Sequence, residues 1–210
     1  MKKYDTIYKH YETCFEQHGD TAEGVDWPNE DDARKRYQVM WDIVEQTINP
    51  TPSLLDFGCG LSHFYEFLNE ECADIHYYGA DISQKFIDAS IKKFPTNTYY
   101  CLDILEDNLL HEFDYIVANG VFTEKQAMSH AEMFDFMCSV LSELFSVCKK
   151  GMAFNVMSKN VEWERDDLFH VSMDELSAFV CQNLSRNFVI RNDYGLHEYT
   201  MYVYSIALDS

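Results

Sequence analysis

The feature that most constrains the fold is an alternation, from about residue 50 onward, of short apolar runs with stretches of helical period. Five apolar runs precede or separate the helical stretches, at 53–57, 75–80, 98–102, 113–118 and 151–157. Such alternation predicts a parallel sheet with helices on both faces. Two closing strands, 188–191 and 198–207, are joined by a short glycine-containing link, which predicts a hairpin. The sequence therefore predicts an α/β fold: a doubly wound, seven-stranded, mostly parallel sheet whose last strand is antiparallel.

The first fifty residues differ from the rest, because they read as two helices around an acidic, glycine-bearing loop at 18–29. They carry many aromatic residues, among them Tyr11 and Trp27, which is too much apolar surface for a solvated tail. We interpret residues 1–49 as an N-terminal helical cap over a core at 50–210, within a single domain of residues 1–210. We expect the cap to cover a bound ligand; the alternative is a segment that packs on the outer face of the sheet.

The charge of the chain excludes several classes of partner. Acids number 36 and bases 16, a formal net charge of −20, so nucleic acid and anionic membranes are disfavoured. No apolar run reaches the roughly 20 residues of a transmembrane helix, and the N-terminus lacks the apolar core of a signal peptide. The seven cysteines form no C-x-x-C pair. We therefore expect a cytoplasmic protein, monomeric or homodimeric, without a disulfide framework, and the histidine spacing predicts no metal site.

The segment Leu54–Ser62 (LLDFGCGLS) carries the strongest chemical signal. A buried strand runs into a glycine-rich turn that opens a helix, the arrangement at which ligands bind in open α/β sheets. A dinucleotide site would require G-x-G-x-x-G, but His63 stands where the third glycine belongs. Asp56, just before the turn, disfavours a pyrophosphate and favours a cationic ligand with sulfonium and ammonium groups.

Here the sequence resembles the class I S-adenosylmethionine-dependent methyltransferases. Asp56, Gly58 and Gly60 match their first motif, with Ser62 in the place of the third glycine. Asp81 follows 25 residues after Asp56, at the end of the second predicted strand. Later matches are Asp103, which closes the third strand, and the stretch 113–120 beside the reacting centre.

The resemblance implies S-adenosylmethionine as cofactor and assigns contacts to it. Asp56 would bind the methionine amine, Asp81 the ribose hydroxyls and Asp103 the adenine amino group. The remaining implied cofactor contacts are the turn residues Gly58, Cys59 and Gly60, the adenine neighbours Ile82 and Ile104, and Asn119.

Other candidates rest on their position in the predicted fold. Arg36, on the helix before the first strand, is a candidate partner of the donor carboxylate. His170, His197 and Asn119 are candidate catalytic residues, because each lies where this fold places its acceptor. We expect methyl transfer to an oxygen or nitrogen nucleophile of a small molecule. The alternatives are a non-catalytic S-adenosylmethionine-binding protein, a nicotinamide-dependent oxidoreductase, and aminopropyl transfer from the decarboxylated donor.

Overall fold

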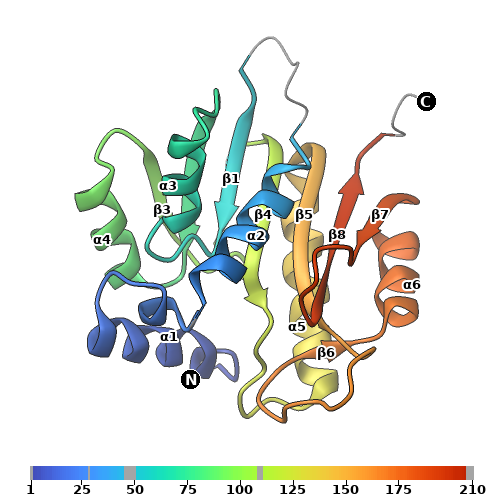
Figure 1. Ribbon diagram of the computed structural model, residues 1–210. Coiled ribbons are helices and arrows are strands. Elements are labelled where there is room, and N and C mark those ends of the chain that lie inside the picture. The colour runs from blue at the N-terminus through green and yellow to red at the C-terminus, as the bar shows by residue number, and fades with distance from the viewer. Residues whose placement is uncertain (1, 28, 45–50, 108–110, 207–210) are drawn as a thin grey trace.

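The computed structural model describes residues 2–27, 29–44, 51–107 and 111–206. Its helices and strands alternate from β1 onward, as the apolar pattern predicts (Figure 1). The elements before the sheet are α1 (Asp5–His18), η1 (Glu23–Val25) and α2 (Glu30–Trp41). The helices that follow are α3 (His63–Glu70), α4 (Gln84–Lys93), α5 (His130–Ser146) and α6 (Met173–Asn183). The strands are β1 (Ser53–Phe57), β2 (His76–Asp81), β3 (Thr98–Cys101), β4 (Phe113–Phe122), β5 (Cys148–Ser158), β6 (His170–Val171), β7 (Asn187–Arg191) and β8 (Glu198–Tyr204).

The sheet has the strand order β3-β2-β1-β4-β5-β8-β7, and the two-residue β6 pairs with the end of β5. Strands β1 to β5 pair in parallel, whereas β8 is antiparallel to both β5 and β7. This confirms the predicted sheet with its antiparallel last strand. Strand β8 ends at Tyr204, and residue 207, its predicted end, lies outside the described residues. The order reverses between β1 and β4, which is where ligands bind in open α/β sheets.

Neighbouring residues of each strand point to opposite faces and so build two cores. Leu55 and Ile116 belong to a core with α5 and α6, whereas Leu54 and Tyr115 belong to a second core with α2 and α3. Helix α4 packs against β2 and β3. The helices therefore cover both faces of the sheet, as the sequence predicts (Figure 1).

The N-terminal segment divides into two parts. Helix α1 and η1 lie at the edge of the sheet where β1 ends, whereas α2 runs across one face (Figure 1). Helix α2 is anchored in the core through Val39, Met40 and Trp41, and the Tyr202 hydroxyl donates to the Val39 carbonyl. The two parts of this segment are thus placed differently: residues 2–27 lie over the sheet edge, and α2 packs on the sheet. The predicted boundary at residues 49 and 50 lies outside the described residues.

Strand β4 continues beyond its predicted end at Ala118 to Phe122. Its pairing with β5 shifts register between Ala118 and Phe122, and Gly120 adopts a φ of +79° there. The indole of Trp27 covers this glycine so closely that an added Cβ would lie 2.8 Å from Cζ2. The irregular end of β4 therefore seats a side chain from the segment that precedes α2.

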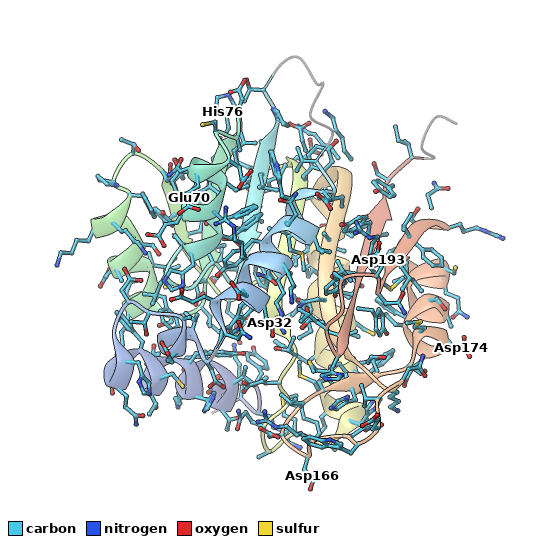
Figure 2. The ribbon with its side chains drawn as sticks, in the orientation of Figure 1. Asp32, Glu70, His76, Asp166, Asp174 and Asp193 are labelled. Carbon is cyan, nitrogen blue, oxygen red and sulfur yellow. The ribbon has the colours of Figure 1, made fainter. Side chains whose placement is uncertain are left out.

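The acidic surface is spread around the molecule. Exposed carboxylates such as Glu70, Asp166, Asp174 and Asp193 lie on different sides in Figure 2. All seven cysteines are free thiols, as the absence of paired spacing predicts. Within the described ranges, no helix combines the length and apolar character needed to cross a lipid bilayer.

Candidate active site

A cavity of about 180 Å³ lies where β1, β2 and β4 end, beneath α1 and η1. Residues from the ends of these strands form its floor, and aromatic residues from the N-terminal segment form much of its wall. The wall includes Tyr4, Tyr8, Tyr11, Trp27 and Tyr37. The N-terminal segment therefore contributes directly to the cavity wall, with Tyr11 and Trp27 among the lining residues.

The glycine-rich turn between β1 and α3 needs its glycines for conformation and for space. Gly58 and Gly60 have φ values of +74° and +50°. A Cβ on Gly58 would lie 2.5 Å from the Val121 Cγ2 atom, so any other residue would push β4 away. Ser62, in the place of the family's third glycine, also has a positive φ of 58°. Its buried hydroxyl donates to Ser90 Oγ over 2.8 Å, which ties the turn to α4.

Asp56 is the buried acid of the site. Its side chain lines the cavity and accepts a 2.7 Å hydrogen bond from the Tyr77 hydroxyl. Burial raises the pKa of Asp56 to about 7, although the Tyr77 bond opposes this. A cation in the cavity would stabilise the charged form. The role of Tyr77 was not predicted from the sequence. Strands β1 and β2 pair in parallel with Leu54 opposite Tyr77, so Tyr77 lies on the strand next to Asp56, and this pairing is the signal that could have found it.

Asp81 ends β2 and is held by two backbone donors. Its Oδ2 accepts from the Gly60 N–H at 3.0 Å, and its Oδ1 accepts from the Ser83 N–H at 2.8 Å. Burial nevertheless raises the pKa of Asp81 to about 6. These bonds fix the carboxylate against the glycine-rich turn, with its edge on the cavity.

Asp103 also lines the cavity, but its carboxylate is hydrogen-bonded to two residues from the first turn of the chain, Lys2 and Tyr4. Its Oδ2 accepts from Lys2 Nζ at 2.6 Å and from the Tyr4 hydroxyl at 2.7 Å. Partial desolvation alone would raise the pKa of Asp103, but these two bonds outweigh it and leave the pKa lowered. Neither Lys2 nor Tyr4 carries a sequence signal for this contact, because about a hundred residues separate them from Asp103.

Apart from Arg36, the other predicted cofactor residues also line the cavity. They are Gly58, Cys59, Gly60, Ile82, Ile104 and Asn119. The buried Oδ1 of Asn119 has no hydrogen-bond partner among the described residues. A buried oxygen without a partner, on a residue that lines a cavity, is suited to a hydrogen-bond donor from a ligand.

Arg36 was predicted to contact the carboxylate of the donor, but the structure gives it other partners. It does not line the cavity; its Nε and Nη2 instead contact Glu198 Oε2 at 2.8 and 2.7 Å. Glu198 is buried, and its other oxygen accepts from Asn155 Nδ2 at 2.9 Å. The guanidinium also lies 4.7 Å from the centre of the Trp27 ring. Arg36 is therefore engaged with a buried carboxylate and supports a cavity wall rather than facing the cavity.

The two candidate catalytic histidines also lie away from the cavity. The buried His170 donates from Nδ1 to the Ser158 carbonyl over 2.7 Å, and its Nε2 accepts from the Arg165 N–H. With both ring nitrogens engaged, His170 stabilises the connection between β5 and β6 and cannot serve as a base at the cavity. His197 is an exposed residue of the link before β8. The predicted topology did not show where either histidine side chain would lie, because topology gives the edge of the sheet at which a residue stands but not the direction of its side chain.

Comparisons with known proteins agree with this architecture. Residues 55–151 match the model of a family described as a methyltransferase domain. A protein of Mycobacterium tuberculosis named "Putative methyltransferase Rv1506c" is 25% identical over 156 residues, which cover 72% of this chain and 92% of the relative.

Two solved structures share the fold over nearly the whole chain. The magnesium protoporphyrin IX methyltransferase ChlM from Synechocystis PCC 6803, solved with bound SAM, has a TM-score of 0.68 at 14% identity, with 98% of each chain covered. The plantazolicin methyltransferase BamL, in complex with a triazolic analogue and SAH, has a TM-score of 0.62 at 12% identity, with 98% of this chain and 92% of that chain covered. The acids and glycines that meet at the cavity thus belong to a chain that is similar over residues 55–151 to a methyltransferase domain and that shares its fold with methyltransferases solved with SAM or SAH.

Proposed function

We propose that this enzyme binds S-adenosylmethionine in the cavity and transfers its methyl group to an oxygen or nitrogen of a small molecule. One observation carries the proposal: three carboxylates, those of Asp56, Asp81 and Asp103, surround the glycine-rich turn in a single cavity. Among the described lining residues there is no lysine or arginine. A cavity of this kind suits a ligand that carries ammonium and sulfonium charges.

The three acids divide the donor between them in this proposal. Asp56, deepest and fully buried, receives the ammonium group, which compensates the cost of its charge. Asp81 accepts from the ribose hydroxyls, since a carboxylate keeps lone pairs beyond its two backbone bonds. Asp103 has fewer positions left beside Lys2 and Tyr4 and takes the adenine amino group, with Ile82 and Ile104 against the base.

The same charges argue against a nicotinamide cofactor. Asp103 is paired with Lys2, but a pyrophosphate would still stand beside the carboxylates of Asp56 and Asp81 without a cation among the described lining residues, and in a sheltered site like charges repel strongly. The oxidoreductase alternative therefore has no support in this site.

Methyl transfer asks mainly for positioning, because the sulfonium methyl is already activated and departs from a neutral thioether. Holding the acceptor in line can contribute about 7–11 kcal/mol. The one histidine on the described cavity wall, His63, contacts Asp20 Oδ1 at 2.7 Å through Nε2. We therefore propose no general base, and we assign Asn119 Oδ1 to a contact with the donor or the acceptor.

The acceptor side is aromatic. Tyr8, Tyr11, Trp27 and Phe136 line the cavity, and such rings favour flat or apolar small molecules. The solved relatives support this class, since their names give magnesium protoporphyrin IX and plantazolicin as substrates.

Calorimetry tests the donor. We expect S-adenosylhomocysteine to bind and NAD not to bind. Asp81→Ala should weaken S-adenosylhomocysteine at least tenfold, since charge-assisted hydrogen bonds contribute roughly 1.5–3 kcal/mol each. Asp88→Ala, which changes an exposed acid on α4, is the matched control and should bind normally. Binding of NAD alone, or unchanged affinity in Asp81→Ala, would contradict the proposal.

A further inference from the structure

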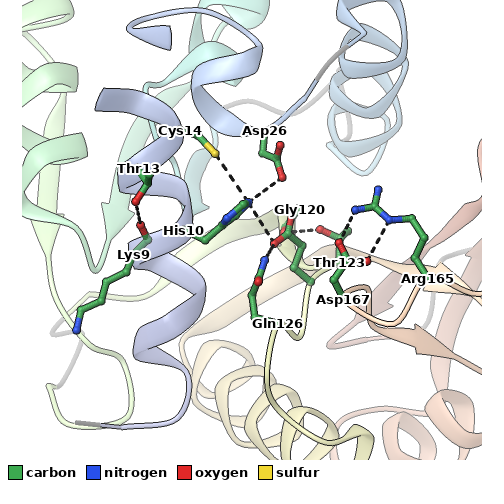
Figure 3. A network of polar contacts seen from close by, with 11 residues as sticks. Lys9, His10, Thr13, Cys14, Asp26, Gly120, Thr123, Gln126, Arg165 and Asp167 are labelled. Carbon is green, nitrogen blue, oxygen red and sulfur yellow. Dashed lines mark hydrogen bonds and ion pairs between the residues drawn. The ribbon is translucent and has the colours of Figure 1, made fainter. Parts of the chain in front are cut away.

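The second polar cluster of the molecule joins the cap to the end of β4, outside the cavity. It consists of His10 and Cys14 on α1, Asp26 just after η1, and Glu124 just after β4. Figure 3 shows the His10 ring with contacts to both Cys14 and Asp26. Nothing in the proposed methyl transfer uses these residues.

The geometry of the cluster is close to that of a metal site. His10 Nε2 lies 2.9 Å from Asp26 Oδ2, 3.8 Å from Cys14 Sγ and 3.7 Å from Glu124 Oε2. The donor atoms of His10, Cys14 and Asp26 all lie within 4.8 Å of one another. Ligands of a tetrahedral Zn²⁺ ion stand roughly 3.3–3.6 Å apart, as its bond lengths of about 2.0–2.3 Å require. The His10 contacts therefore need to change by about half an ångström or less.

The charge of the cluster points to a cation. Asp26 and Glu124 face one another, and Glu124 is buried. Among the described residues Glu124 contacts His10 and the neutral amide of Gln126, and the nearby Arg165 is paired with Asp167 (Figure 3). The two acids thus lack a full counter-charge at contact distance among the residues described around them.

We propose that His10, Cys14 and Asp26 form a binding site for Zn²⁺, with the Glu124 carboxylate beside it. Imidazole and thiolate ligands favour zinc over Mg²⁺ or Ca²⁺, which prefer oxygen. The His-x₃-Cys spacing on α1 places both soft ligands on one helix face. On binding, the Cys14 thiol loses its proton to solvent and the sulfur coordinates the ion.

The site would tie three segments together beside the cavity. Tyr11 and Trp27, the chain neighbours of His10 and Asp26, both line the cavity wall. A bound ion would hold these aromatic residues against the end of β4. Zinc would therefore stabilise the closed cap without touching the donor.

The test uses the reduced full-length protein with Zn²⁺ and the spectroscopic substitute Co²⁺. We expect one tightly bound ion per chain by chelator competition, and cobalt spectra with thiolate-to-metal charge transfer and tetrahedral bands. Cys14→Ser should abolish the charge-transfer band and weaken zinc about a hundredfold or more. Glu124→Gln should weaken zinc by a smaller factor, and Mg²⁺ should not compete.

Cys72→Ser, at an exposed thiol remote in the fold, is the matched control and should behave as the unmodified protein. Zinc should raise the melting temperature of the unmodified protein and of Cys72→Ser, but not that of Cys14→Ser; circular dichroism checks that Cys14→Ser is folded. Equal zinc affinity in Cys14→Ser, loss of binding in Cys72→Ser, or no zinc binding at all would each overturn the proposal. Donor affinity measured without zinc tests the proposed function separately.

Discussion

At the scale of single residues, Asp56 is a buried carboxyl whose negative charge is unfavourable in the ligand-free site. The carboxyl is buried at the point where the strand order reverses, and it accepts a hydrogen bond from the Tyr77 hydroxyl. Burial raises its pKa from an ordinary value of 3.8 to about 7. The ligand-free protein therefore takes up a proton at Asp56 when it folds at intermediate pH.

This uptake predicts a pH-dependent stability. An acid whose pKa is raised in the folded state lowers the free energy of unfolding as pH rises from about 4 to about 7. In Asp56→Asn this loss should vanish, so the variant should gain on the unmodified protein between pH 4.5 and pH 8 by about 3 kcal/mol. Urea unfolding at both pH values measures it.

Glu124 also has a raised pKa and contributes equally to both proteins, whereas Asp81 interacts electrostatically with Asp56, so the measured difference includes that interaction. Asp56→Asn should also bind S-adenosylhomocysteine more weakly, most of all above pH 7, where the native carboxylate is charged. Parallel stability curves for the two proteins would show that Asp56 titrates normally.

At the scale of elements, the cap and α2 are attached in different ways. Helix α2 buries four apolar residues, whereas α1 buries Ile7 alone and is otherwise attached through partly buried aromatic residues and polar contacts. The polar contacts of α1 and the loop after it include Ser83 to Glu12, Lys85 to Glu16, and Lys93 to Asp20. Exposed ion pairs contribute about 0–1 kcal/mol each. The cap should therefore open at a lower free energy than the rest of the fold.

Hydrogen exchange measures this difference. Amides of α1 should exchange at least tenfold faster than the inner amides of α2, and S-adenosylhomocysteine should slow those of α1 because it contacts the cap wall. Deleting residues 1–28 should leave a folded core that binds the donor at least tenfold more weakly, since the cavity loses its aromatic wall. Full donor affinity in the truncated protein would show that the cap plays no part in binding.

At the scale of the whole molecule, a buried polar network joins β4, β5, β8 and α2. Asn155 accepts from the Gly120 N–H at 2.7 Å and donates to Glu198, which receives the Arg36 guanidinium. Arg36 in turn lies over Trp27, which covers Gly120. The network thus closes a ring between the interior of the sheet and the cavity wall.

Breaking this ring should cost both stability and binding. Removing one partner of a buried ion pair costs about 3–5 kcal/mol, and the partial exposure of Arg36 places Arg36→Met near the lower end. Arg36→Met combined with Glu198→Gln should cost less than the sum of the single changes. Because Arg36 supports Trp27 rather than the donor carboxylate, Arg36→Met should weaken S-adenosylmethionine and its decarboxylated analogue equally. A selective loss for S-adenosylmethionine would instead return Arg36 to the donor carboxylate.

The amino-acid sequence alone was sufficient to predict the architecture and the acids that form the floor of the cavity. Apolar periodicity predicted the strands and helices, because burial on the two faces of a sheet depends only on local spacing. The acids Asp56, Asp81 and Asp103 could be expected to meet, because parallel strands end at the same edge.

The side chains that join these acids at the edge of the sheet come from distant parts of the chain, and long-range packing places them there. Lys2 reaches Asp103 across 101 positions of the chain, and Arg36 reaches Glu198 across 162. The cluster of His10, Cys14 and Asp26 likewise needs the loop after α1 to fold back on the helix. Contacts of this kind depend on the packing of distant elements and on side-chain direction, and local periodicity carries no record of either.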